Sequence, residues 1–365
     1  MPIPAAKNPP VQTKSRTQAL DGIRGVAIGA VIASHYVPVF APGGFDGGAY
    51  GVLVFFVLSG YLITTLLLKE HERTGRIELK AFYIRRALRL LPALYLFLLV
   101  ALALAFTVGR QLRMDPDGAV TGAVMAFFYV FNFADFQGLQ IPHSMTVLWT
   151  LSVEEQFYLL WPLVLILLLG APALKPRLQK LVLGAAVVFT LLGIVAFLFL
   201  GLMSFYRTWT WIAPLLLGAS LAIAQRRTQG QFGAEVAKFA PIAWCLLLLV
   251  ALSPPTLNSV VTHAVVVPLL SLASCVIIAR STGSQATVST RVLGSPLLVY
   301  VGRRSYGLYL WNLLALESLE PFITDPVLLI VCALAVAFAV AEASYRWVEM
   351  PALRHKHRFE RAQLA

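Results

Sequence analysis

Apolar runs of roughly 18 to 23 residues recur along nearly the whole chain, from residue 22 to residue 345. A helix of that length crosses about 30 Å of hydrocarbon. Of the 365 residues, 59% are hydrophobic and 13% are charged, which leaves too few polar side chains to cover a water-soluble globule of this size. The sequence therefore predicts an all-α polytopic membrane protein.

We expect about ten transmembrane helices in a single integral-membrane domain, residues 19–353. Their expected ranges are 22–40, 50–69, 88–108, 147–169, 181–201, 207–225, 239–253, 259–279, 295–316 and 326–345. If the apolar stretch 119–136 also crossed, several basic loops would lie outside, so we interpret it as a re-entrant or interfacial segment. Residues 1–18 are expected to form a disordered cytoplasmic tail and residues 354–365 a short basic cytoplasmic tail.

The positive charges are distributed unevenly between the loops. With a cytoplasmic N-terminus, 26 of the 29 Lys and Arg residues lie on the cytoplasmic side, as the positive-inside rule requires. The sequence thus predicts a multi-pass protein of the inner (plasma) membrane, surrounded by lipid. Since the cations lie at the ends of apolar runs, the net charge of +12 does not indicate a nucleic-acid partner.

The sequence contains no motif for a metal or a tightly bound cofactor. Cys245, Cys275 and Cys332 each lie within an apolar run and have no metal-ligand spacing, so they are expected to be packing residues. There is also no small-residue cleavage site after the first apolar run, and no removable signal peptide is expected.

The first apolar run carries ionisable residues that a lipid-facing helix would lack. Arg24 and His35 are eleven positions apart, which places them on one helical face about 16 Å apart along the axis, and Asp21 shares that face. Arg24 could instead reach the headgroups, and His35 could be held by a neighbouring helix. A deep imidazole aligned with a cation favours function, so Arg24 and His35 are candidate catalytic residues.

Three arginines lie at the start of the third span. Arg85, Arg86 and Arg89 are spaced to share a helical face at the inner membrane surface. Their guanidinium groups can bind phosphate oxygens in a bidentate manner, so we predict a site for a phosphorylated donor together with Arg24. A cluster that binds lipid headgroups is the alternative.

The fourth span opens with two adjacent carboxylates. Glu154 and Glu155 point about 100° apart, so at least one should line a polar cavity. We expect Glu154 at the depth of His35, where its carboxylate could orient the imidazole as a catalytic residue. A structural carboxylate bonded to aromatic or backbone groups is the alternative.

These motifs, in this order, resemble those of the membrane acyltransferase 3 family, which includes bacterial O-antigen, exopolysaccharide and macrolide O-acyltransferases. The resemblance runs from about residue 18 to residue 353. The matching elements are Leu20-Asp21-Gly22-Ile23-Arg24-Gly25 with His35, Phe55-Phe56-Val57-Leu58-Ser59-Gly60-Tyr61-Leu62-Ile63, Arg86-x-x-Arg89-x-x-Pro92, Trp149-Thr150-Leu151-Ser152-Val153-Glu154-Glu155-Gln156-Phe157-Tyr158, Gly302-x-x-Ser305-Tyr306-Gly307-Leu308-Tyr309-Leu310-Trp311 and Glu349-Met350-Pro351.

The resemblance implies an acyl-coenzyme A donor, with acetyl-coenzyme A as the first candidate, and essential roles for Arg24 and His35. The family commonly has a histidine where this chain has Asn312, so a second catalytic histidine is not expected there. Some members carry a C-terminal extracytoplasmic esterase-like domain. This chain ends about a dozen residues after Pro351 and is expected to be the form without it.

The resulting hypothesis is acyl transfer from acyl-coenzyme A to a hydroxyl of a carbohydrate-containing acceptor, such as a cell-surface polysaccharide, a lipid-linked glycan or a macrolide. His35 would act as general base, and direct transfer and an acyl-histidine intermediate both stay open. Candidate cavity-lining residues are Asp21, Ser59, Tyr61, Glu155, Tyr158, Tyr306 and Asn312.

Two other classes of protein share these features. A proton-coupled transporter also places His, Glu and Arg within the membrane, and a glycan flippase could bind lipid phosphate with the same arginines. A transporter would show matched broken helices in two halves, and we find no such repeat of the 20–40 or 147–169 pattern. Acyl transfer is therefore the favoured hypothesis.

Overall fold

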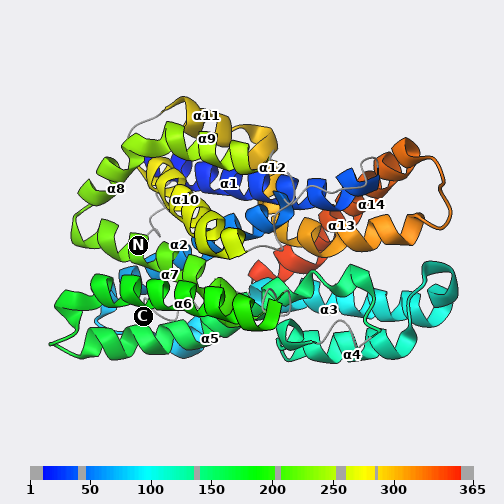
Figure 1. Ribbon diagram of the computed structural model, residues 1–365, viewed down its shortest axis with the longest axis horizontal. Helices are drawn as coiled ribbons and strands as arrows, with labels where there is room; N and C mark the ends of the chain where they lie inside the picture. Colours follow the sequence, from blue (N-terminus) through cyan, green and yellow to red (C-terminus); the bar gives the residue numbers. More distant parts are fainter. Residues whose placement is uncertain are drawn as a thin grey trace, which may run out of the picture.

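A computed structural model describes residues 11–39, 47–134, 140–201, 207–251, 260–283 and 287–354. Within these ranges the chain is helical and contains no strand. Most helices run along the long axis of the molecule and pack side by side (Figure 1). Nine helical segments of the described chain are long and apolar enough to cross a membrane, which confirms the all-α polytopic class.

The long helices follow the predicted spans closely. Their bounds are α1 Val11–Tyr36, α2 Gly47–Thr74, α3 Leu79–Leu112, α5 Leu148–Gly170, α6 Leu178–Leu200, α7 Thr208–Arg227, α9 Ala240–Ala251, α10 Val267–Thr282 and α14 Pro326–Ser344. The shorter helices are α4 Pro116–Phe127, α8 Gln231–Val236, α11 Val288–Leu293, α12 Pro296–Arg303 and α13 Ser305–Leu319. Helix α9 itself has 12 residues, but it continues from α8 without a gap, so that Gln231–Ala251 forms one apolar segment of 21 residues.

The N-terminal boundary differs from the prediction. Helix α1 begins at Val11, so residues 11–18 are helical rather than a disordered tail. Residues 1–10 and 355–365 lie outside the described residues. The helical turns that follow Pro10 continue directly into the apolar run, because no proline interrupts the sequence from residue 11 to residue 36.

Helix α4 has the length expected of a segment that does not cross the bilayer. It contains 12 residues, which rise about 18 Å, less than the hydrocarbon thickness of about 30 Å. The Asp115 carboxylate caps its start by accepting a hydrogen bond from the Gly118 amide, and Pro116 takes the first helical position.

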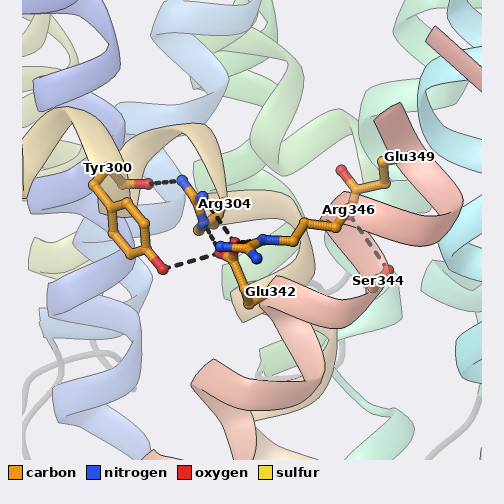
Figure 2. Close-up of polar contacts among 6 residues, drawn as sticks. All are labelled: Tyr300, Arg304, Glu342, Ser344, Arg346 and Glu349. Atoms are coloured by element: carbon orange, nitrogen blue, oxygen red, sulfur yellow. Dashed lines mark hydrogen bonds and ion pairs between the residues drawn. The ribbon is translucent and has the colours of Figure 1, made fainter. Parts of the chain in front are cut away.

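The predicted span 295–316 consists of two helices rather than one. Helices α12 and α13 have 8 and 15 residues and are separated at Arg304, whose backbone is not helical (φ −100°, ψ 4°). The Arg304 guanidinium stacks on the Tyr300 ring at 3.6 Å and forms ion pairs with both carboxylate oxygens of Glu342 on α14. Glu342 also accepts hydrogen bonds from Tyr300 and Arg346 (Figure 2). These contacts connect the junction between α12 and α13 to α14.

Two close backbone contacts bring the central helices together. A side chain at Gly302 of α12 would collide with the Asp21 carbonyl of α1, and one at Gly60 of α2 would collide with the Leu215 carbonyl of α7. Such contacts require glycine, because no Cβ fits between the backbones.

The bundle has two ends with different composition. At one end α2 ends, α3 begins and α7 ends, near Arg73, Lys80 and Arg227, and we call this the basic end. At the other end α1 ends and α2 and α5 begin, and we call this the distal end. Gly48 of α2 lies against Ser34 of α1 there, which shows that these helix ends are neighbours.

Candidate active site

A cavity of about 1060 Å³ extends into the bundle from the basic end, and we call it the central cavity. On α2 its lining reaches from Arg73 to Val52, a distance of about 31 Å by helical rise. Seven cations line it, namely Arg24, Lys69, Arg73, Arg85, Arg86, Arg89 and Arg226. Four carboxylates line it, namely Asp21, Glu70, Glu72 and Glu154, so positive charge is in excess.

Three of the predicted arginines are held by carboxylates, and Arg24 and Arg86 are two of them. Arg24 Nη1 lies 2.9 Å from Asp21 Oδ1. Arg86 Nε lies 3.4 Å from Glu155 Oε1, and its guanidinium stacks on the Tyr158 ring at 3.6 Å. These contacts hold both guanidinium groups in place before any ligand arrives, which reduces the ordering cost of binding.

Arg85 contacts a different helix from its neighbour Arg86. Its Nη2 lies 3.4 Å from Glu70 Oε2, and Glu70 also accepts the Glu78 amide at 3.2 Å. Glu70 therefore connects the end of α2 to the start of α3. We assign Arg85 to the mouth of the central cavity.

Arg89 differs from the other three arginines. Within the described part of the chain it has no ion pair or hydrogen bond, although it lines the central cavity. Arg89 lies deep in the protein, but it is solvent-accessible because it faces the cavity. Arg24 and Arg86 lie close enough to repel it electrostatically. An unpaired guanidinium beside two others is a site for an anion.

The arginines lie deeper than the inner membrane surface that the sequence predicts. Arg86 pairs with Glu155, and the neighbouring Glu154 bonds to Ser59 of α2. Helix α2 continues for 15 residues beyond Ser59, or about 22 Å, before it ends at Thr74. The Arg86 guanidinium is therefore well inside the bundle and is reached through the central cavity.

The predicted pair of His35 and Glu154 is wrong. Glu154 accepts hydrogen bonds from the Ser59 hydroxyl and, at 2.9 Å, from the Tyr158 hydroxyl. Helix α5 thus turns this carboxylate toward α2 and the central cavity. His35 lies nearer the distal end and bonds to α13 instead. Sequence could not distinguish these arrangements, because the depth of Glu154 depends on how α5 is displaced along its neighbours.

Asn312 is the hydrogen-bond partner of His35. His35 Nδ1 lies 2.5 Å from Asn312 Oδ1. The Asn312 amide nitrogen donates to the carbonyls of Leu308 at 2.8 Å and Tyr309 at 2.9 Å, so the oxygen must face His35. An amide oxygen only accepts, so Nδ1 carries the proton, and Nε2 is left as the basic nitrogen.

On α13, Tyr309 is the last residue before Asn312 that lines the central cavity. Its hydroxyl lies 2.7 Å from Thr150 Oγ1 and 2.8 Å from the Val147 carbonyl, and both Tyr309 and Thr150 line the cavity. Asn312 and His35 do not line it. Because Asn312 follows Tyr309 by three residues on α13, His35 lies about one helical turn beyond the last cavity-lining residue of this helix.

A second histidine, which sequence reasoning missed, lies at the distal end. His143, in the short helix His143–Met145, forms an ion pair with Glu317 of α13. Both groups interact electrostatically with His35. A histidine in a loop carries no periodic signal that would reveal this proximity, which arises only when α13 packs beside the loop.

The remaining predicted cavity residues divide into three groups. Asp21, Ser59, Tyr158 and Tyr306 line the central cavity as expected. Tyr61 and Asn312 do not, since the Tyr61 hydroxyl bonds to Gln225 at 2.9 Å and Asn312 bonds to His35. Glu155 lines a second cavity on the other side of Arg86. No group of three or more potential metal ligands occurs among the described residues.

Comparison with known families identifies the family of this chain. The sequence model described as the acyltransferase domain matches residues 17–346. The chain belongs to the membrane acyltransferase 3 family. The match identifies an acyltransferase domain, and it favours an enzyme over the transporter and flippase alternatives. The comparison with solved structures found no match.

Relatives of this acyltransferase domain include three bacterial proteins. A Staphylococcus aureus protein named "Putative O-acetyltransferase" is 32% identical over 358 residues, covering 91% of this chain and 56% of its own length. The peptidoglycan O-acetyltransferase OatA of Listeria monocytogenes is 30% identical over 377 residues, covering 91% and 55%. A Bacillus subtilis protein named "Putative peptidoglycan O-acetyltransferase" is 28% identical, covering 91% and 54%. The chain therefore spans about half the length of these relatives.

Proposed function

We propose that this acyltransferase moves an acyl group, with acetyl as the first candidate, from acyl-coenzyme A to a hydroxyl of a cell-envelope glycan. The protein would lie in the inner (plasma) membrane with its basic end in the cytoplasm. The observation that carries the proposal is the central cavity, which leads from a cationic mouth past the unpaired Arg89 to a wall one turn from His35.

The donor would enter from the basic end. Coenzyme A carries several phosphates on an extended arm, and the excess of cations suits phosphates at the mouth and at Arg89. The remaining arm and its thioester would then extend along the cavity toward Tyr309. The cavity length of about 31 Å on α2 leaves room for an extended ligand.

The transfer step would take place beside His35. The acceptor hydroxyl gives its proton to His35 Nε2 as its oxygen bonds to the thioester carbonyl carbon. The carbon–sulfur bond then breaks, and the proton passes from Nε2 to the departing thiolate. Asn312 keeps the proton on Nδ1 throughout and so leaves Nε2 ready to accept another. The thioester passes Tyr309, so the Tyr309–Thr150 contact must open in the donor complex.

The acceptor would approach from the distal end. Two of the relatives are named for O-acetylation of peptidoglycan, so peptidoglycan is the first acceptor to test, ahead of other surface polysaccharides, lipid-linked glycans and macrolides. His143 and Glu317 would be the first polar groups that such an acceptor meets, since the His143 side chain is 74% exposed.

The decisive experiment combines genetics and biochemistry. Glycans and secreted metabolites of a deletion strain are compared by mass spectrometry with those of the parent, and membranes containing the protein are supplied with labelled acetyl-coenzyme A. We expect one acyl mass to disappear from one glycan, and label to enter that glycan only with active protein. Unchanged glycans together with the absence of labelled product would contradict the proposal.

A further inference from the structure

A second cavity of about 900 Å³ lies on the membrane-facing side of α5, and we call it the lateral groove. Its walls come from α3, α5, α6, α7 and the segment after α4, and include Ala87, Val164, Ala185 and Ile212. Leu159 and Leu160 on its rim are 58% and 57% exposed, in the apolar belt of a membrane protein. The groove therefore opens toward lipid rather than toward the central cavity.

The polar group at the base of the lateral groove is Glu155. Its Oε1 contacts Arg86 at 3.4 Å, and its other oxygen, Oε2, has no partner among the described residues. Glu155 lines the lateral groove and not the central cavity. Burying a neutral polar group without a hydrogen-bond partner costs about 1–3 kcal/mol. The cost is larger for a charged carboxylate oxygen in hydrocarbon.

A tyrosine with an unusual backbone lies beside this carboxylate. Tyr129 has φ 54°, in the left-handed region that few residues other than glycine adopt. Gln156 holds it there by donating to its carbonyl at 2.7 Å. Burial raises the pKa of the Tyr129 phenol, so it stays neutral, and it interacts electrostatically with Glu155. Its hydroxyl has no hydrogen bond to another described residue.

The other polar side chains at this level are already satisfied. Gln156 Nε2 also donates to Asn132 at 2.8 Å, Asn132 donates to Thr208 at 2.7 Å, and the Thr208 hydroxyl donates back to Gln156. Among the described residues, the unused hydrogen-bonding capacity of the groove is therefore one carboxylate oxygen, one phenol and the two Nη groups of Arg86, whose bond to Glu155 uses only Nε.

We propose that the lateral groove binds a bilayer amphiphile with a hydrocarbon chain and a neutral, hydroxyl-bearing head. The chain would occupy the apolar walls, and the head hydroxyl would donate to Glu155 and bond to Tyr129. A plain hydrocarbon would leave the carboxylate oxygen unpaired. An anionic head would place a second negative charge beside Glu155, whose own charge already balances that of Arg86. Arg86, Leu90 and Tyr158 line both cavities, so the bound head would lie directly behind the wall of the central cavity.

The test uses the full chain in phosphatidylcholine vesicles and three probes of equal chain length: a long-chain alcohol, the corresponding alkane and the corresponding carboxylic acid. The alcohol and the alkane each carry a diazirine for photolabelling. We expect the alcohol to label the peptide around Leu160 and Val164 saturably, and the alkane to label lipid-facing helices evenly. The unlabelled acid should compete poorly against the alcohol, and it should compete well after Glu155→Gln.

Two variants separate groove binding from general lipid contact. Ala185→Trp places a ring in the groove from α6, which carries neither member of the ion pair, and should abolish saturable labelling. Ala103→Trp, on the exposed side of α3 and outside the groove, should leave labelling unchanged. Equal, non-saturable labelling by both probes, or saturable labelling that survives Ala185→Trp, would overturn the proposal. Effective competition by the acid against unaltered protein would overturn the role of Glu155.

Discussion

His35 and Asn312 are 277 residues apart in the chain, yet Nδ1 of the histidine lies 2.5 Å from Oδ1 of the asparagine. The Tyr36 hydroxyl adds a second bond between the same helices by donating to the Asn312 carbonyl at 2.9 Å. The end of α1 is thereby attached to the middle of α13. Asn312 stands where the family commonly has a histidine, and its side-chain oxygen fixes the tautomer of His35.

Replacing Asn312 by Leu should lower kcat for acyl transfer by about 10- to 100-fold, because Nδ1 loses the acceptor that keeps its proton in place. Asn312→Asp should retain more activity, since a carboxylate also accepts from Nδ1. Steady-state kinetics with labelled acetyl-coenzyme A measure both variants. His35→Ala is the reference, and it should still bind donor but form no product. Normal product from His35→Ala would refute the catalytic assignment.

Arg89→Gln should weaken donor binding by about tenfold to a hundredfold, the cost of one charge-assisted hydrogen bond to phosphate. Thermal stability should not fall, because Arg89 has no ion pair among the described residues. Titration with a labelled donor analogue gives the affinity. Lys238→Gln, whose lysine pairs with Glu235 at the surface, is the matched control. An unchanged affinity in Arg89→Gln would remove the phosphate role of this residue.

Arg86→Gln should behave differently from Arg89→Gln. Removing Arg86 leaves the largely buried Glu155 carboxylate without its ion-pair partner, at a cost of about 3–5 kcal/mol. We therefore expect a lower Tm in detergent for Arg86→Gln, and recovery of part of that loss in Arg86→Gln/Glu155→Gln. Equal stability of Arg86→Gln and unaltered protein would show that the ion pair contributes little.

Tyr309→Ala should open the distal wall of the central cavity. The hydroxyl that bonds to Thr150 and the Val147 carbonyl is lost, together with the ring that closes the cavity. In a background without the three native cysteines, Ser59→Cys should react slowly with a membrane-impermeant thiol reagent from the distal side. Adding Tyr309→Ala should make the reaction much faster. Tyr300→Ala, outside the central cavity, should have no such effect.

Glu342→Gln should destabilise the junction between α12 and α13, by about 1–3 kcal/mol, because one carboxylate bonds to Arg304, Arg346 and Tyr300. The measurement is thermal unfolding in detergent. Glu235→Gln, in an exposed pair with Lys238, should leave Tm unchanged because such pairs contribute little. A Tm shift of equal size in both variants would mean that the junction has no special role.

Much of the secondary structure followed from the sequence. The apolar runs predicted the long helices, because a bilayer requires backbone hydrogen bonds to close within each segment. The short α4 agreed with the interpretation of 119–136 as non-spanning. The break at Arg304 was not predicted, since hydropathy averages over a window and does not register one residue held out of the helix by Glu342 on α14.

The candidate site was predicted in its residues but not in its pairings. Composition and spacing sufficed to select Arg24, His35, Arg86, Arg89 and Glu154, because ionisable groups are costly in lipid and stand out in an apolar chain. Their partners depend on the relative shift and rotation of helices that are distant in sequence. Because of that packing, His35 forms a hydrogen bond with Asn312 and Glu154 forms one with Ser59. Arg89 has no ion pair or hydrogen bond to another described residue in the central cavity. The period of a helix determines which side chains share a face, whereas only the tertiary structure decides what that face meets.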